Sequence, residues 1–154
     1  AIDLASAGAS PARDFKVIAP ASRFVAAGRG GRRTIDAAGY RRYDGLVETV
    51  TSIDAASVAR IYKTIRPRLN EAYQRTGNPT GNVDNALLKA IDILLDTPIV
   101  KDPIPIIEDD KAGWVYADDD LEELLPTQKQ LLRMGSANVE KLLAWLRALR
   151  TALQ

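Results

Sequence analysis

Carboxylates and tyrosines are the residues of this chain that could do chemistry. The sequence has 20 Asp and Glu residues and 5 tyrosines, and it has no cysteine and no histidine. Those two absences exclude a thiol nucleophile, a disulfide, the usual kind of zinc site and a serine–histidine pair. Carboxylates and tyrosines facing each other across a cleft could instead act as acid and base, or hold a small polar ligand. A hydrolase or small polar-ligand-binding protein of this kind would draw on Asp84, Asp92, Asp109, Asp118, Glu122, Tyr40 and Tyr73.

Motifs that would make catalysis specific are missing. No serine has a lysine three residues after it, and no glycine-rich loop ends in Lys-Ser or Lys-Thr. The stretch GRGGRR at 28–33 could cradle a phosphate or form a basic patch, but a phosphate loop opens a helix, and the residues after this stretch predict a strand. We therefore predict a hairpin turn there and no cofactor, and the sequence favours a non-enzymatic protein over an enzyme.

Two acidic clusters, at 108–110 and 118–123, could bind a cation. An EF-hand loop needs alternating oxygen ligands, a central glycine and a closing glutamate. The 118–123 cluster has no glycine and continues into a helical pattern, and 108–110 has no closing glutamate at the required distance. We predict helix capping and a solvated turn in the segment 102–123, rather than a metal site.

Arginines and one tryptophan are the candidates for contact with a partner. The tyrosines of YRRYD at 40–44 could stack bases or line a ligand pocket. Because YRRYD lies on a predicted helix, they are instead expected in the core, with its arginines away from the buried stripe. Trp114, in KAGWVY, is either an exposed anchor for a partner or a lid that closes one end of the core, and the lid is favoured. The candidate contact residues are Arg29, Arg32, Arg33, Arg41, Arg42 and Trp114.

The stretch RMGSANVEKLLAWLRALR at 133–150 has the outline of a helix-turn-helix. A DNA-reading motif has a turn of about three to four residues and places basic residues near the start of its second helix. Here Gly135 and Ser136 leave almost no turn, and the first basic residue of the second helix, Lys141, follows an acidic one. We predict a tight structural corner and no nucleic-acid partner.

The expected fold is mainly α (α+β), a single compact domain of about five or six helices with a small β-hairpin element. Residues 1–22, rich in Ala, Ser, Gly and Pro, predict a loosely ordered lead-in in which FKVIA could form a short strand. The helical domain with its β element then covers 23–154. FVAA and RTID predict the strands of the hairpin, and IPII and GWVYA predict a second pair.

Apolar residues at three- and four-residue spacing predict the helices. The first runs from Asp36 to about Ser52, and the second begins at Asp54 and is kinked or split at Pro67. Later helices are expected to begin at Asn82, at the 118–120 aspartates and at Ser136. The expected buried face of the second helix comprises Val58, Ile61, Tyr62, Ile65, Leu69, Ala72 and Tyr73.

The hydropathy of the sequence indicates whether it inserts into a membrane, and its first residues indicate whether it is part of a longer protein. No apolar run is long enough to cross a bilayer, so no membrane insertion is expected of this sequence. No secretory signal pattern begins the chain, and the first residue is alanine, so we expect a piece of a longer protein.

Three stretches, taken in order, resemble a known family. They are YRRYDGLVETVTSIDAASVARIYKTIRPRLNEAY at 40–73, WVYADDDLEELL at 114–125 and TQKQLLRMGSANVEKLLAWLRALRTAL at 127–153. Together they resemble the uncharacterised bacterial family called domain of unknown function 3014, over about residues 34–152. The resemblance implies an envelope protein of Gram-negative bacteria with an N-terminal membrane anchor and a Pro-rich linker, located on the periplasmic side of the inner membrane. It implies no activity and no catalytic residue, and it leaves a cytoplasmic location open. The implied partner is an unknown protein or envelope component.

Overall fold

The β-sheet combines two hairpins into one antiparallel sheet of order β1-β2-β3-β4. Strands β1 (Ala26–Arg29) and β2 (Arg32–Ile35) form the first hairpin, and β3 (Pro105–Asp109) and β4 (Gly113–Tyr116) form the second. Both hairpins were predicted from the sequence. Their union was not, and it rests on β2 pairing with β3 at Arg33 opposite Ile106 and Thr34 opposite Pro105.

Helices make up most of the rest of the chain, as predicted for a mainly α (α+β) fold. The computed structural model describes residues 5–9, 24–30, 32–75, 80–110 and 113–154. The predicted strand FKVIA and most of the lead-in 1–22 lie outside these residues. The described helices are α2 (Ala37–Arg41), α3 (Asp44–Thr51), α4 (Ala55–Arg75), α5 (Val83–Leu95), α6 (Asp119–Glu122), α7 (Pro126–Leu132) and α8 (Ser136–Leu153). None of the helices in this part of the chain is long and apolar enough to cross a membrane.

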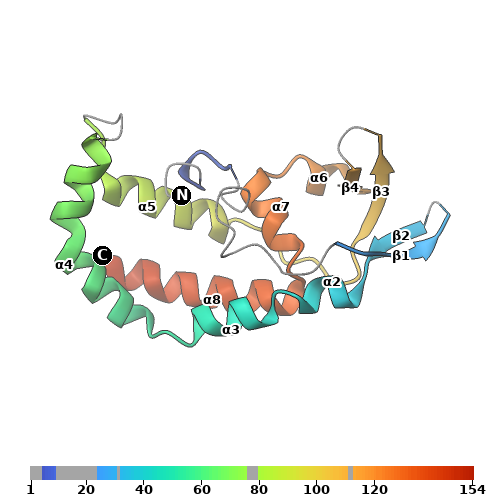
Figure 1. Ribbon diagram of the computed structural model, residues 1–154, viewed down its shortest axis with the longest axis horizontal. Coiled ribbons are helices and arrows are strands. Elements are labelled where there is room, and N and C mark those ends of the chain that lie inside the picture. Colours follow the sequence, from blue (N-terminus) through green and yellow to red (C-terminus); the bar gives the residue numbers. More distant parts are fainter. Residues whose placement is uncertain (1–4, 10–23, 31, 76–79, 111–112) are drawn as a thin grey trace.

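The compact fold has a helical end and a sheet end (Figure 1). Helices α4, α5 and α8 gather at one end, and the sheet lies at the other with α2, α6 and α7 beside it. Each end has its own apolar cluster, and α7 joins the two. Leu131 packs among residues of α4, α5 and α8, whereas its neighbour Leu132 packs with the sheet residues Ile35, Ile106 and Tyr116.

The predicted helix from Asp36 to Ser52 is interrupted. Asp36 caps α2 as expected, because its carboxylate accepts a hydrogen bond from the Ala38 N–H. The chain then turns at Arg42 and Tyr43, and α3 begins at Asp44. The break allows Tyr40 to pack in the sheet cluster while α3 runs along α8, two directions that one straight helix could not serve.

Helix α4 departs most from its predicted packing. Asp54 caps its start, because its carboxylate accepts from the Ser57 N–H, and the helix is continuous through Pro67. In Figure 1 it bends and extends past α8. The predicted burial of Ile61 and Ile65 is wrong: their exposed fractions are 62% and 44%. Only the first turns of α4, at Ala55 and Ala59, are buried in the helical cluster.

The corner between α7 and α8 is tight, as predicted, but its cap differs. Gly135 has a positive φ of 85° and turns the chain directly into α8. The Ser136 side chain does not cap the helix as predicted. Instead the Asp102 carboxylate accepts hydrogen bonds from the Ser136 N–H and hydroxyl, each at 3.0 Å, and so serves the helix start from another part of the chain. Asn82 and Asp118 do cap α5 and α6 as predicted.

Candidate interaction site

Three arginines and three aromatic rings meet between the sheet and α2 and α7. We call this set the arginine–aromatic cluster, and its members are Phe24, Arg33, Arg42, Tyr43, Trp114 and Arg133. Five of the six side chains are partly exposed, and only Tyr43 is buried. The set is therefore a partly accessible surface on top of the sheet-end apolar cluster.

Phe24 is at the centre of the cluster. The guanidinium carbons of Arg42 and Arg133 lie 5.6 and 5.9 Å from the centroid of its ring. The Trp114 ring is tilted against it, with centroids 6.3 Å apart. These distances fit cation–π and aromatic pair contacts, in which the positive charge or ring edge faces the negative face of a π system.

The two remaining contacts extend the cluster along the sheet and toward α3. Arg33 on β2 places its guanidinium carbon 5.3 Å from the Trp114 ring on β4. Arg42 also stacks over Tyr43 at 4.9 Å and donates to the Tyr43 hydroxyl at 3.2 Å. Gln130 on α7 donates to that same hydroxyl at 2.9 Å, which ties the turn between α2 and α3 to α7.

The chemistry available to the cluster is recognition of anions. A guanidinium stacked on a ring uses its flat face, so the N–H donors along its edge stay directed outward and can bind a carboxylate or phosphate in a forked pair. Within the described part of the chain, neither Arg33 nor Arg133 has a carboxylate within ion-pair distance. One of Arg133's donors reaches the Trp114 carbonyl at 3.4 Å.

A network of polar residues borders the cluster and fixes its supporting elements. Glu122 on α6 accepts from the Tyr116 N–H of β4 at 2.9 Å and from the Lys129 amine of α7. The Tyr116 hydroxyl in turn donates to the Lys129 carbonyl at 2.9 Å. Burial acts to raise the pKa of Glu122, but the Lys129 and Tyr116 hydrogen bonds outweigh it and hold that pKa below its usual range. Glu122 is therefore ionised and engaged with Lys129.

The predicted contact residues divide into two groups. The structure brings Arg33, Arg42 and Trp114 together in the cluster, whereas Arg29 and Arg41 are exposed and do not belong to it. The side chain of Arg32 lies outside the described residues. The expectation that Arg42 points away from the buried stripe is wrong, since its side chain is half-buried against two rings.

Sequence reasoning did not assign three members of the cluster to it. The sequence predicts Phe24 as a strand residue and favours Tyr43 as a core residue over a base-stacking or pocket-lining one. Arg133 belongs to the stretch that has the outline of a DNA-reading corner and that resembles the family. No local spacing links these residues, because β2, β4 and α7 are brought together only by the sheet and the tertiary fold. Trp114 packs against the sheet-end apolar cluster, which agrees with the favoured role as a lid.

Three of the residues proposed for a cleft, Tyr40, Asp92 and Asp118, each have a separate structural partner. Tyr40 is buried and its hydroxyl accepts from the Ile104 N–H at 3.0 Å, Asp92 pairs with Arg150, and Asp118 caps α6. Burial, the main cause, raises the pKa of Tyr40 to about 12. No group of three or more acidic residues that could hold a metal ion occurs among the described residues.

One of the carboxylates proposed for a cleft does face a small cavity. Asp84 accepts from the Tyr62 hydroxyl at 2.6 Å and lies 3.5 Å from the Arg66 guanidinium. These three side chains, with Lys63 and apolar residues, line a cavity of about 130 Å³. Burial and the Asp84 carboxylate raise the pKa of the Tyr62 hydroxyl.

Comparison with known proteins gives one finding. The model of a family described as "Protein of unknown function (DUF3014)" matches residues 1–150 of the chain. No curated protein and no solved structure matches it.

Proposed function

We propose, from the premise that the chain belongs to the DUF3014 family, that it is a non-enzymatic interaction module of the bacterial cell envelope. In this proposal an N-terminal segment beyond this sequence anchors it on the periplasmic side of the inner membrane. Its partner is a protein or other envelope component that presents carboxylate or phosphate groups. The family's function is itself unknown, so the interaction part of the proposal rests on the residues of this chain, and the envelope location rests on the family resemblance.

The arginine–aromatic cluster is the observation that carries the proposal. Arginine, tryptophan and tyrosine are the residues that dominate the binding energy of protein interfaces, since they combine large apolar area with directed hydrogen bonds. Arg33 on β2 and Trp114 on β4 are paired and partly exposed, so a partner could cover both at once. Because the cluster's donors are positioned by stacking, little side-chain freedom would be lost on binding.

The test is a cross-linked pull-down from native envelopes with the full-length, anchored protein. We expect at least one partner to be captured reproducibly, and we expect Arg33→Gln to reduce its capture about tenfold, as for a central contact residue. The matched control is Arg147→Gln, which removes an exposed arginine from α8 at a distance from the cluster. A reproducible partner that is lost equally from both variants, or no reproducible partner at all, would contradict the proposal.

Location is tested separately. The full-length protein, carrying an epitope tag at its C-terminus, should fractionate with the inner membrane, and the tag should be degraded by protease added to spheroplasts. A tag protected until the membrane is broken would place the domain in the cytoplasm and reject the envelope part of the proposal. Partner capture would remain a valid test of the interaction part.

A small polar-ligand-binding role is the second candidate, and the cavity at Tyr62 and Asp84 favours it. A carboxylate, a phenol and a guanidinium around about 130 Å³ would suit a small polar molecule with a cationic or hydroxyl group. Thermal-shift screening with polyols, amino acids and polyamines tests this role. A stabilising compound whose effect disappears in Asp84→Asn supports it, and the absence of any such compound rejects it.

A further inference from the structure

The second half of α4 leaves large apolar side chains in solvent. Ile61 is 62% exposed and Ile65 is 44% exposed. They are four residues apart and so lie one turn apart on the same face of the helix. Ala72, also exposed, lies two further turns along that face. The elements that pack on α4, namely α5 and α8, leave this face uncovered.

Cations lie on and next to this apolar face: Arg68 is seven residues from Ile61 and so shares its face, whereas Lys63 is two residues from each isoleucine and lies on the opposite side of α4. Within α4 the charged residues are Arg60, Lys63, Arg66, Arg68, Glu71 and Arg75. Arg66 and Arg75 pair with Asp84 and Glu71. Arg60, Lys63 and Arg68 are exposed, and none of them has a carboxylate within ion-pair distance among the described residues.

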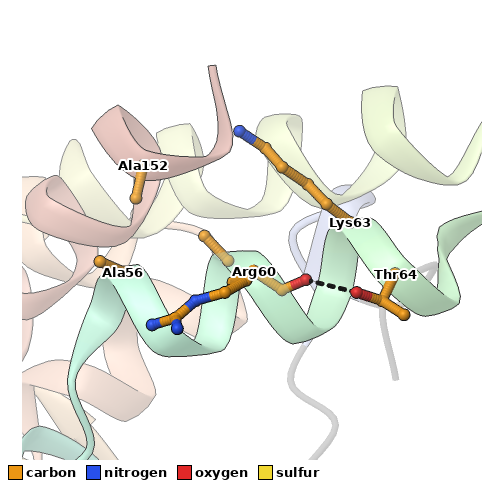
Figure 2. A pocket seen from close by; sticks show the side chains of 6 residues that line it. Ala56, Arg60, Lys63, Thr64 and Ala152 are labelled. Atoms are coloured by element: carbon orange, nitrogen blue, oxygen red, sulfur yellow. Dashed lines mark hydrogen bonds between the residues drawn. The ribbon is translucent and has the colours of Figure 1, made fainter.

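A groove adjoins the same helix where α4 passes the end of α8. Its cavity volume is about 500 Å³, and Ala56, Ala59 and Ala152 provide small apolar walls. Figure 2 shows Lys63 extending between α4 and the end of α8, and Arg60 lying along α4 beside Ala56. Thr64, whose hydroxyl donates to the Arg60 carbonyl at 3.0 Å, borders the groove. Arg60 and Thr64 precede Ile61 and Ile65 in sequence, so this shallow groove lies beside the apolar face, about a quarter turn around α4.

We infer that this surface of α4 docks an amphipathic helix of a partner protein, one whose apolar seam is flanked by Asp and Glu. The seam would cover Ile61 and Ile65, and acidic residues beside it would meet Arg60 and Arg68. Charge complementarity selects the occupant, because an apolar helix with basic flanks would bring like charges together. The alanine-walled groove provides room for side chains of a second helix packed at close range.

An anionic membrane is the competing occupant, and the geometry disfavours it. A helix that lies in a bilayer surface buries a continuous apolar face rich in Trp, Phe or Leu. The exposed face of α4 offers two isoleucines and interspersed cations, which is less than the continuous apolar face that a bilayer surface requires. The inference is independent of the proposed role of the arginine–aromatic cluster, which lies at the opposite end of the molecule (Figure 1).

Fluorescence anisotropy with designed probes tests the inference on this chain. The main probe is a labelled helical peptide of about 18 residues with a leucine seam flanked by glutamates. Its comparison peptide replaces the glutamates with lysines. Phosphatidylglycerol-rich vesicles and a DNA duplex represent the other classes of anionic partner. We expect the glutamate peptide to bind about tenfold or more tightly than the lysine peptide.

Variants locate the binding on α4. The double variant Ile61→Ser with Ile65→Ser should weaken binding of the glutamate peptide about tenfold, and Arg60→Gln with Arg68→Gln about threefold or more. The matched control is Ile99→Ser, since Ile99 is 49% exposed but does not belong to α4. Circular dichroism and thermal unfolding confirm that each variant is folded, which is expected because the changed side chains are in solvent. Equal binding of both peptides, binding of vesicles or DNA but not of the glutamate peptide, binding of no probe, or equal losses in Ile99→Ser would each overturn the inference.

Discussion

Hydrogen bonds around Tyr40 connect the sheet-end apolar cluster to the start of α8. The Tyr40 hydroxyl accepts from the Ile104 N–H in the sheet-end cluster and lies near the Asp102 carboxylate. Asp102 in turn holds the start of α8 through Ser136. One tyrosine ring therefore supports both the strand entry at Ile104 and the corner into α8. Each group in this series of hydrogen bonds pairs with the donor or acceptor of the next, so removing one group should leave its partner unpaired.

Tyr40→Phe should lower the free energy of unfolding by about 1–3 kcal/mol, because the buried Ile104 N–H would lose its acceptor. Ile104 is 1% exposed, so water cannot easily replace the hydroxyl. Urea denaturation measures the loss. Tyr62→Phe is the matched control: its hydroxyl donates to the more exposed Asp84, and we expect a loss of about 1 kcal/mol or less. Equal losses of unfolding free energy in the two variants would show that burial of the Ile104 N–H does not determine the effect.

Glu122 should make stability depend on pH. Its pKa is lowered in the folded state from the usual 4.5, so its contribution is fully present above that pH and is lost as the pH falls through the folded-state pKa. At neutral pH, Glu122→Gln should reduce the free energy of unfolding by about 1 kcal/mol or less, since the pair with Lys129 is partly solvated. The difference between wild type and variant should shrink on acidification below pH 4.5. Urea denaturation across that range tests it, and a constant difference would contradict the ionic role.

At the scale of the elements, the corner between α7 and α8 is the sharpest local feature. Gly135 has a φ of +85°, and a Cβ added there would lie 3.0 Å from the Cβ, Cγ and Cδ1 atoms of Tyr40. A side chain at this position is therefore opposed both by the backbone conformation and by a buried ring. The glycine that the sequence identifies as a helix stop is also the residue that lets Tyr40 approach α8.

Gly135→Ala should lower the free energy of unfolding by about 1–3 kcal/mol, through the strained φ and the contact with Tyr40. Gly45→Ala is the opposite case, because Gly45 lies inside α3 with nothing within 4 Å of an added Cβ. Replacing a helical glycine there should raise stability by about 0.5–1 kcal/mol. Thermal unfolding of both variants measures the contrast. A neutral or stabilising effect at Gly135 would show that the corner is not constrained as described.

The elements were predictable where their signals are local. Asp36, Asn82 and Asp118 are caps because a short polar side chain can reach its own helix start. The exposure of Ile61 and Ile65 was not predictable in the same way, because helical periodicity identifies an apolar face and does not tell what covers it. The cap on α8 was also missed, because Asp102 is 34 residues away from Ser136.

The candidate site was predictable only in part for the same reason. Turn signals pointed to Arg33 beside the glycine turn and to Trp114 beside the acidic loop, and the predicted helix at YRRYD pointed to Arg42. Phe24 and Arg133 join them through the pairing of β2 with β3 and the packing of α7, contacts between segments far apart in the chain. Such contacts leave no periodic pattern in a single sequence.

At the scale of the whole molecule, the two surfaces lie at opposite ends of the fold (Figure 1). The arginine–aromatic cluster rests on the sheet-end apolar cluster, and the α4 surface continues from the turns of α4 that pack in the helical one. Sites that share no residues and no apolar cluster should contribute independently to binding. This arrangement would allow one copy of the domain to hold two anionic partners, or two parts of one partner, at once.

The variants of the two surfaces should therefore have additive effects. Arg33→Gln should remove the partner held by the cluster and spare the partner held by α4, and Ile61→Ser with Ile65→Ser should do the reverse. Combined, they should lose both, with each loss unchanged to within about 0.5 kcal/mol. Quantitative cross-linking mass spectrometry of the four forms of the full-length protein measures these losses. If instead a single partner is lost from either variant alone, both ends of the domain bind one extended ligand. Each surface by itself would then bind too weakly to retain that ligand.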